Sequence, residues 1–287
     1  EARQSVIDMG IVRRRKEDVA KDIPARRIAD IPVELDDEFG RSIRESEALL
    51  MQRLVDRYDR IIAGRGDQPS GIDEDIVRLV AHSEVEESKS SDTGDNVFAM
   101  VRRIGQAKAT LAADYTAQLA GNVGKVVFFA KHIDVMDAAE QHFAKAGIKT
   151  TSIRGDQSST ARTTAIDDFT NDPDVKVIVC SLTAAGVGIN LQVASNVVLA
   201  ELSWTSAEQT QAIDRVHRIG QELPVTAWRI LAAQTIDSRI ADLIDSKAGL
   251  AARALDGNDS EIEQSESVQT AALMALLTDA LAARINA

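Results

Sequence analysis

The sequence predicts an α/β fold in which a doubly wound parallel sheet occupies residues 97–255. Short apolar runs of strand length alternate with amphipathic stretches of helix length throughout this region. The runs are nearly continuous in valine, isoleucine and phenylalanine, which is typical of parallel strands covered on both faces. Together these observations favour a parallel sheet between two helical layers, with an added helical segment N-terminal to it and a C-terminal helix.

Two segments precede the sheet region. Residues 1–33 contain a basic cluster and two prolines, and they are expected to be an extended linker that ends as a strand. Residues 34–95 are expected to be a helical insertion: apolar residues recur at intervals of three and four from Asp36 to Ile62, and a shorter amphipathic piece follows at 72–82. The stretch 83–96 is acidic and serine-rich, which predicts a mobile loop.

The sheet region itself divides into alternating elements. Strands are expected at 126–130, 148–153, 175–181, 196–201 and 225–231. Helices are expected at 97–120, at 132–147 with Gly147 as the terminator, from Ser158 or Ser159 to 169, at 206–219 and at 235–255. Residues 256–287 would form an acidic linker and a final helix at 268–285. That helix is apolar enough to need a docking surface, so a protein partner for it is possible.

Composition limits the classes of function. The net charge is −12, yet residues 96–255 carry 16 basic and 16 acidic side chains, so the acidity lies outside the predicted sheet. A neutral domain can still present a basic face to nucleic acid. The single cysteine, Cys180, excludes a disulfide framework and a cysteine-rich metal site. Without a signal peptide or an 18-residue apolar run, we expect a cytoplasmic protein with no membrane partner.

Two of the expected strands end in segments that could hold a ligand, because ligands of such sheets bind beyond the carboxyl ends of the strands. The segment 181–191 combines small residues, two glycines and the hydroxyls of Ser181 and Thr183. It could hold a phosphate or could simply be a tight turn. After the next strand, Trp204 stands in a polar loop, where it could pack against the core or serve as a ligand platform.

The segment QAIDRVHRIGQ at 211–221 is more specific. It places Arg215 and Arg218 three residues apart, on one face of the expected helix. Arginines near the end of a helix can simply complement its dipole. However, a helix with so many polar residues in eleven positions is unusual for a purely structural role.

These eleven residues resemble the last helicase motif of SWI/SNF-type ATPases in helicase superfamily two. SLTAAGVGINLQVAS (181–195) resembles the preceding motif, and AELSW (200–204) its tryptophan-bearing extension. KVVFFAKHIDVMDAAEQ (125–141) resembles the motif that opens the second lobe, and IRGDQSSTARTTAIDDF (153–169) resembles its glycine–arginine–phenylalanine segment, here Gly155, Arg162 and Phe169. VRRRKEDVAKDIPARR (12–27) looks like the segment by which the chain leaves lobe one. The resemblance covers roughly residues 10–35 and 97–250, in the family's order.

The resemblance implies a RecA-like second motor lobe of an ATP-dependent DNA translocase. ATP and Mg²⁺ would lie between this lobe and an N-terminal RecA-like lobe of the same protein, with double-stranded or branched DNA across both. Arg215 and Arg218 would be the catalytic arginines that reach the γ-phosphate. The residues expected near the nucleotide are Gly188, Asn190 and Gln211, and those expected on DNA are Ser181, Thr183, Trp204 and Arg154.

The sequence departs from the family pattern at two places. Glu201 stands where aspartate is frequent, and Thr205-Ser206 replaces an Asn-Pro pair. No G-x-x-x-x-G-K-[ST] motif and no Asp-Glu pair after a buried strand are present. The chain alone is therefore expected to bind no ATP tightly and to be inactive. The alternative is a non-catalytic regulatory or adaptor domain that keeps the RecA-like fold, although two retained arginines disfavour it. In a bacterial cell the protein would be associated with the nucleoid.

Overall fold

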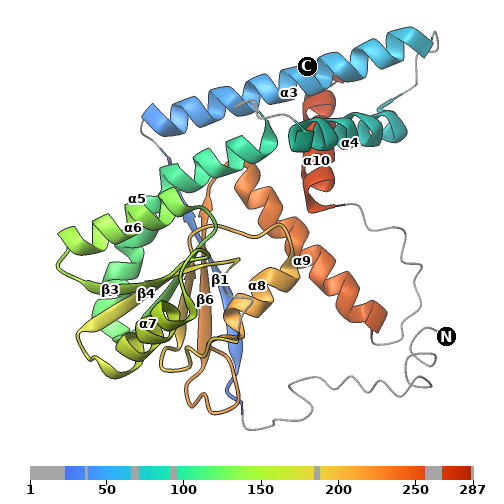
Figure 1. Ribbon diagram of the computed structural model, residues 1–287. Helices are drawn as coiled ribbons and strands as arrows, with labels where there is room; N and C mark the ends of the chain where they lie inside the picture. Colours follow the sequence, from blue (N-terminus) through green and yellow to red (C-terminus); the bar gives the residue numbers. More distant parts are fainter. Residues whose placement is uncertain are drawn as a thin grey trace.

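Six parallel strands form one sheet in the order β1-β6-β5-β2-β4-β3 in the computed structural model (Figure 1), which describes residues 23–35, 38–65, 71–90, 96–183, 188–255 and 267–285. The strands are β1 Arg26–Val33, β2 Val126–Ala130, β3 Lys149–Ile153, β4 Val175–Ser181, β5 Asn196–Leu199 and β6 Val225–Ala232. The helices are α3 Glu38–Arg65, α4 Glu74–Ser90, α5 Val97–Val123, α6 Ile133–Lys145, α7 Ser159–Asn171, α8 Ser206–Ile213, α9 Ile236–Leu255 and α10 Val268–Ile285.

Helices cover both faces of this sheet, as the apolar strands predict. One face packs on α5 and α6 through alternate residues such as Phe128 of β2 and Phe143 of α6, whose rings meet edge to face. The opposite face packs on α7 and α8, and Phe129 of β2 and Phe169 of α7 belong to its apolar cluster. Cys180 lies fully buried in β4, and burial raises the pKa of its thiol far above the ordinary value. The expected doubly wound RecA-like sheet is confirmed.

The first strand of the sheet comes from the segment that was expected to be a linker outside it. β1 pairs in parallel with β6, from Arg26 beside Val225 to Val33 beside Ala232. Arg229 of β6, only 3% exposed, binds Asp30 of β1 and Asp245 of α9 through both ends of its guanidinium. The predicted domain boundary at residue 97 therefore leaves out part of the sheet, because the edge strand β1 precedes the helical insertion in the sequence.

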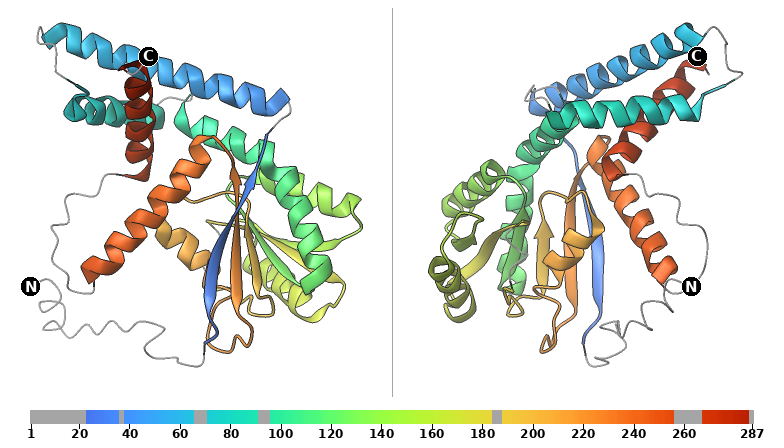
Figure 2. Two further views of the ribbon diagram at one scale, coloured as in Figure 1. Left: turned by 180° about the vertical axis from the view of Figure 1, so that it is seen from behind. Right: turned by 45° about the vertical axis from the view of Figure 1, so that its right-hand side comes forward.

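A second layer of helices lies beyond the carboxyl end of the sheet (Figures 1 and 2). This helical unit consists of α3, α4 and α10, packed on the first turns of α5 and on α9 around one apolar core. α10 is long and apolar enough to cross a membrane, and no other helix among the described residues is. Its apolar face, however, packs within this chain: Leu273 and Leu277 are completely buried. The docking surface that the sequence predicts for this helix is supplied by α3, α4 and α9.

The sequence predicted a mobile loop at 83–96. This prediction was wrong for residues 83–90, which form the last turns of α4. Val85 is 2% exposed and belongs to the apolar core of the helical unit. Glu84 beside it lies within 4 Å of Arg53 and Arg57 of α3. The burial of Val85 and the ion pairs of Glu84 thus stabilise helical structure in a segment whose composition is mostly polar. Residues 91–95 lie outside the described part of the chain.

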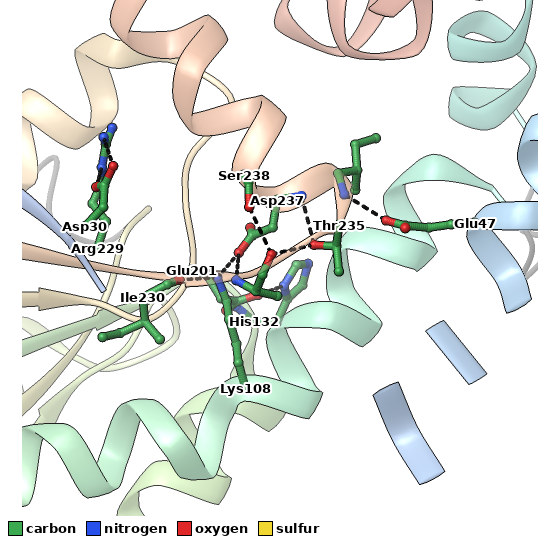
Figure 3. Close-up of polar contacts among 12 residues, drawn as sticks. Asp30, Glu47, Lys108, His132, Glu201, Arg229, Ile230, Thr235, Asp237 and Ser238 are labelled. Atoms are coloured by element: carbon green, nitrogen blue, oxygen red, sulfur yellow. Dashed lines mark hydrogen bonds and ion pairs between the residues drawn. The ribbon is translucent and has the colours of Figure 1, made fainter. Parts of the chain in front are cut away.

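Buried polar contacts join the helical unit to the sheet (Figure 3). Lys108 of α5 is 1% exposed and donates to the Ile230 carbonyl at 2.6 Å and to Asp237 of α9 at 2.5 Å. Glu47 of α3 accepts the Ile236 N–H at 2.7 Å, at the start of α9. A carboxylate at a helix N-terminus satisfies an otherwise unpaired donor and meets the positive end of the helix dipole. The first turn of α9 is therefore fixed by residues of α3 and α5.

Candidate nucleotide and DNA site

The hydroxyls of Ser181 and Thr183 lie together at the carboxyl end of β4. Their oxygens are 2.8 Å apart, and Ser181 is buried while Thr183 is exposed. The intervening Leu182 N–H donates to the Ala130 carbonyl of β2 at 2.8 Å, which fixes the turn. One exposed and one buried hydroxyl, joined by a hydrogen bond, can present a single donor to a phosphate oxygen.

Helix α8 ends at Ile213, earlier than the expected helix over 206–219. Thr205 caps its start by accepting the Glu208 N–H at 3.3 Å, so this departure from the family pattern has a structural role. Residues 214–221 then form a series of turns, which we name the arginine turn. Within this turn the Arg215 carbonyl accepts the N–H of Leu191, at 2.9 Å, from a different loop.

The arginine turn is bound to the loop that follows β4. Arg218 Nη1 donates to the Ile189 carbonyl at 3.3 Å. The Gln221 amide, 6% exposed, donates to the Gln192 and Ala194 carbonyls at 3.0 and 2.9 Å, and its oxygen accepts two backbone N–H groups. Gly220 has φ +96°, and a side chain there would press on Gln192. Gln221 and Gly220 are therefore structural parts of this motif.

Arg215 differs from Arg218 in its side-chain hydrogen bonds. Its Nε is buried and has no hydrogen-bond partner. An unsatisfied buried donor costs about 1–3 kcal/mol, so a native protein keeps few of them without a reason. Arg218, three residues further on, is instead joined to a backbone carbonyl. The two arginines thus stand in different environments in this lobe.

The predicted site residues fall into two groups. Gly188, with φ +45°, and Asn190 are exposed and lie on either side of Ile189, beside Arg218. Gln211 is exposed one turn before Arg215 on α8. These residues, predicted to lie near the nucleotide, are on α8 and near the amino ends of β5 and β6. There the Thr226 N–H donates a hydrogen bond to the Ser195 carbonyl. The second group, predicted to contact DNA, lies at the carboxyl ends of β3, β4 and β5.

Trp204 packs against the protein while keeping part of its surface exposed. Its ring meets Phe98 of α5 edge-on, with centroids 5.8 Å apart, and Lys131 Nζ lies 5.9 Å from its centroid. The two readings that the sequence left open, core packing and ligand platform, are therefore both compatible with its position.

Arg154, which follows β3, is engaged with two carboxylates. Its Nη2 lies 2.7 Å from Asp137 and 3.0 Å from Glu140, both on α6. Partial burial acts to lower the pKa of Arg154, but these two hydrogen bonds raise it above the ordinary value. A DNA phosphate at Arg154 would have to compete with both acids, which makes Arg154 the least available of the four predicted DNA contacts.

The sequence did not reveal the structural role of Glu201, a buried carboxylate just after β5. Glu201, 4% exposed, accepts the N–H groups of Lys131 and His132 at 2.8 and 2.9 Å, and its other oxygen lies 2.6 Å from His132 Nδ1. A side chain at Gly105 of α5 would collide with it, since a Cβ there would stand 2.4 Å from Glu201 Oε1. Glu201 thereby holds Lys131 beside Trp204. Sequence carries no signal for a contact between residues so far apart.

The site therefore combines a six-stranded parallel sheet, a hydroxyl pair at one strand end and two arginines on a turn that is bound to a neighbouring loop. Residues 107–220 match the family described as the Helicase conserved C-terminal domain. A helicase-like transcription factor of Arabidopsis thaliana is 38% identical over 130 residues, which is 45% of this chain and 13% of that protein. An uncharacterised ATP-dependent helicase of Mycoplasma genitalium is 31% identical over 247 residues, covering 85% of this chain and 22% of that protein.

Solved structures share the fold over nearly the whole chain. The C-terminal part of the Fun30 ATPase domain aligns with a TM-score of 0.56 at 17% identity, covering 91% of this chain and 99% of that one. The Sulfolobus solfataricus SWI2/SNF2 ATPase core, solved with double-stranded DNA, aligns at 0.53 and 24% identity, over 89% of this chain and 52% of that one. Residues 107–220 are thus similar in sequence to helicase C-terminal domains, and the fold is the one that these ATPase structures have. The chain spans about a fifth or less of the length of the curated relatives named here.

Proposed function

We propose that this chain supplies the second motor lobe of an ATP-dependent double-stranded-DNA translocase. In that enzyme ATP and Mg²⁺ would be held mainly by an N-terminal RecA-like lobe. Arg215 and Arg218 would approach the γ-phosphate, with Gly188, Asn190 and Gln211 beside the nucleotide. Hydrolysis of the bound ATP supplies the free energy, and this lobe contributes transition-state charge stabilisation.

The buried, unpartnered Nε of Arg215 is the observation that carries the proposal. A donor left without an acceptor inside a well-bonded turn is suited to an acceptor that arrives with a ligand. A phosphate oxygen is such an acceptor, and a guanidinium meets phosphate with paired hydrogen bonds. The family relationship points to the same residue, because the arginine turn lies at the end of the matched region.

DNA would contact the carboxyl ends of the strands. Ser181 and Thr183 offer hydroxyl donors, and Trp204 with Lys131 offers an aromatic face and a positive charge. These groups suit the sugar–phosphate backbone and not base edges, so binding should be independent of sequence and fall steeply with salt. The double-stranded DNA bound to the Sulfolobus solfataricus relative supports this assignment.

DNA-stimulated ATPase measurements test the proposal. The isolated chain should show no turnover, because it lacks a phosphate loop, and joining it to an N-terminal lobe in one polypeptide should produce turnover. In that two-lobed protein Arg215→Ala should lower kcat about 10³–10⁵-fold, the range seen when an arginine finger is removed. Arg284→Ala, which removes an exposed ion pair with Asp59 in the helical unit, is the matched control and should leave turnover unchanged.

Normal turnover in Arg215→Ala would contradict the proposal and would favour the regulatory or adaptor reading. Such a domain would bind a protein partner without needing either arginine. As a DNA motor, the protein would act in the cytoplasm on nucleoid DNA. Microscopy of the tagged protein should then show it overlapping the DNA stain, and a location away from DNA would count against the assignment.

A further inference from the structure

The chain enters β1 directly beside the arginine turn. His217, 8% exposed, lies with its Nε2 2.7 Å from the Pro24 carbonyl oxygen. Because a carbonyl can only accept, Nε2 must carry the hydrogen. Two residues further along, Arg26 Nη1 donates to Asp214 Oδ1 at 3.1 Å. Asp214 immediately precedes Arg215, and His217 immediately precedes Arg218.

The entry of β1 is itself fixed to the sheet. The Val225 N–H donates to the Ala25 carbonyl at 3.0 Å, at the start of β6. Arg27 donates from Nε to Thr226 at 3.0 Å, and its guanidinium lies 5.6 Å from the Trp228 ring centre. Residues 24–27 are therefore anchored on β6, and the contacts to the arginine turn start from a fixed support.

On its other side the arginine turn is bound to the loop after β4, through the Arg215 carbonyl and the Arg218 guanidinium. The turn is thus held between two segments that are distant in sequence, the loop at 188–195 and the entry of β1. Neither contact of the β1 entry uses a guanidinium of Arg215 or Arg218. Both act on the residues next to them, so they set the backbone position of the turn without occupying the guanidinium of either arginine.

We propose that His217 and Asp214 are positioning residues that tie the arginine turn to the entry of β1. These two contacts thereby fix the positions of Arg215 and Arg218 relative to the entry of β1. The inference rests on the proposed function of the arginines. Transition-state stabilisation is sensitive to placement, since a misplacement of about 1 Å can cost 10²-fold in rate.

The test uses the two-lobed protein with DNA-stimulated kcat, KM for ATP and thermal melting as readouts. His217→Phe keeps a ring but removes the donor, and kcat should fall about tenfold or more with KM changed by less than about twofold. His217→Gln, whose side-chain amide can donate to the Pro24 carbonyl, should recover most of the lost turnover. Arg26→Ala and Asp214→Asn should each lower kcat by a smaller factor, and the double variant should be no slower than the slower single one.

Arg284→Ala serves again as the control, because it removes an exposed Arg–Asp pair remote from the arginine turn. Unchanged kcat in His217→Phe, with Arg215→Ala inactive, would overturn the positioning role and leave the proposed function intact. Normal turnover in Arg215→Ala would remove both. If Gln fails to rescue, or if kcat falls only in proportion to folded protein, His217 is a packing residue and the inference is wrong. If His217→Phe does not fold, the Arg26→Ala and Asp214→Asn variants decide the question. Unchanged kcat in both, or a double variant whose loss of kcat is the product of the two single losses, would also overturn the inference.

Discussion

At the scale of single residues, Arg215 and Arg218 should affect the stability of the lobe in opposite ways. Arg215→Met removes a buried donor that has no acceptor, so the free energy of unfolding should stay the same or rise by about 1 kcal/mol. Arg218→Met loses the bond to the Ile189 carbonyl and should lower it by about 0.5–1.5 kcal/mol. Urea unfolding of the isolated chain measures both changes. Greater destabilisation by Arg215→Met than by Arg218→Met would mean that Arg215 is a structural residue.

Glu47 should make the stability of the protein depend on pH. Burial raises the pKa of the Glu47 carboxyl above its ordinary value of 4.5, against the lowering effects of the Ile236 N–H and of Arg239. A raised pKa means that the folded state holds the proton more tightly than the unfolded state. The free energy of unfolding should therefore fall as pH rises from about 4.5 through the raised pKa, and then level off.

Glu47→Gln keeps an acceptor for Ile236 and removes the titration, so it should abolish that part of the pH dependence. Thermal melting of both proteins between pH 4 and pH 8 gives the comparison. The carboxyls of Asp59 and Asp134, whose pKa values are lowered from 3.8 by hydrogen bonds and charges from arginine and glutamine neighbours, change stability only at more acidic pH. Equal slopes in the two proteins above pH 4.5 would show that Glu47 does not titrate as described.

At the scale of elements, α10 should be essential to the helical unit. Leu277 of α10 is completely buried against α3, α4 and α9. Leu277→Ala should lower the free energy of unfolding by about 2–5 kcal/mol, from lost burial and the remaining cavity. Thr278→Ala, at the next and exposed position of the same helix, should change it by less than about 0.5 kcal/mol. Similar effects of the two substitutions in chemical denaturation would indicate that α10 is only loosely docked.

Elements whose reason for folding is local were the ones predictable from sequence. The buried strands carry continuous apolar runs, and α7 is capped by Ser158, whose hydroxyl accepts the Ala161 N–H. The end of α8 and the last turns of α4 were not predictable. The residues just after α8 bond to Leu191 of another loop, and the last turns of α4 pair with Arg53 and Arg57 of a neighbouring helix. Both involve partners that no window of sequence contains.

The candidate site shows the same division. The motifs identified Arg215, Arg218 and the hydroxyls after β4, because these residue types stand at characteristic spacings. They gave no indication that Glu201 would be buried beneath Lys131 and His132, or that His217 would reach Pro24, a residue 193 positions earlier. Those contacts exist only once the sheet has brought its strand ends together.

At the scale of the whole molecule, the lobe and the helical unit should unfold together. Lys108 is almost completely buried and joins α5 to β6 and α9, and Glu47 joins α3 to α9. Lys108→Met would leave Asp237 buried without its cation, and breaking a buried ion pair in this way typically costs about 3–5 kcal/mol. We expect tryptophan fluorescence, which reports on Trp204 and Trp228, and far-ultraviolet circular dichroism to give coincident transitions in the wild-type chain. Two separated transitions would show that the helical unit is an independent domain.

The pairing of β1 with β6 has a consequence for the order of folding. Arg27 and Thr226, joined across these strands, are 199 positions apart, so a ribosome must synthesise most of the chain before the edge strand can dock. Until then the apolar strand β6 would have one side without a neighbour, and an unprotected apolar strand edge invites pairing with another chain. Contacts this distant in sequence also form slowly. A fragment beginning at residue 97 would keep that edge permanently open, and it should aggregate during expression where a fragment beginning before Pro24 stays soluble.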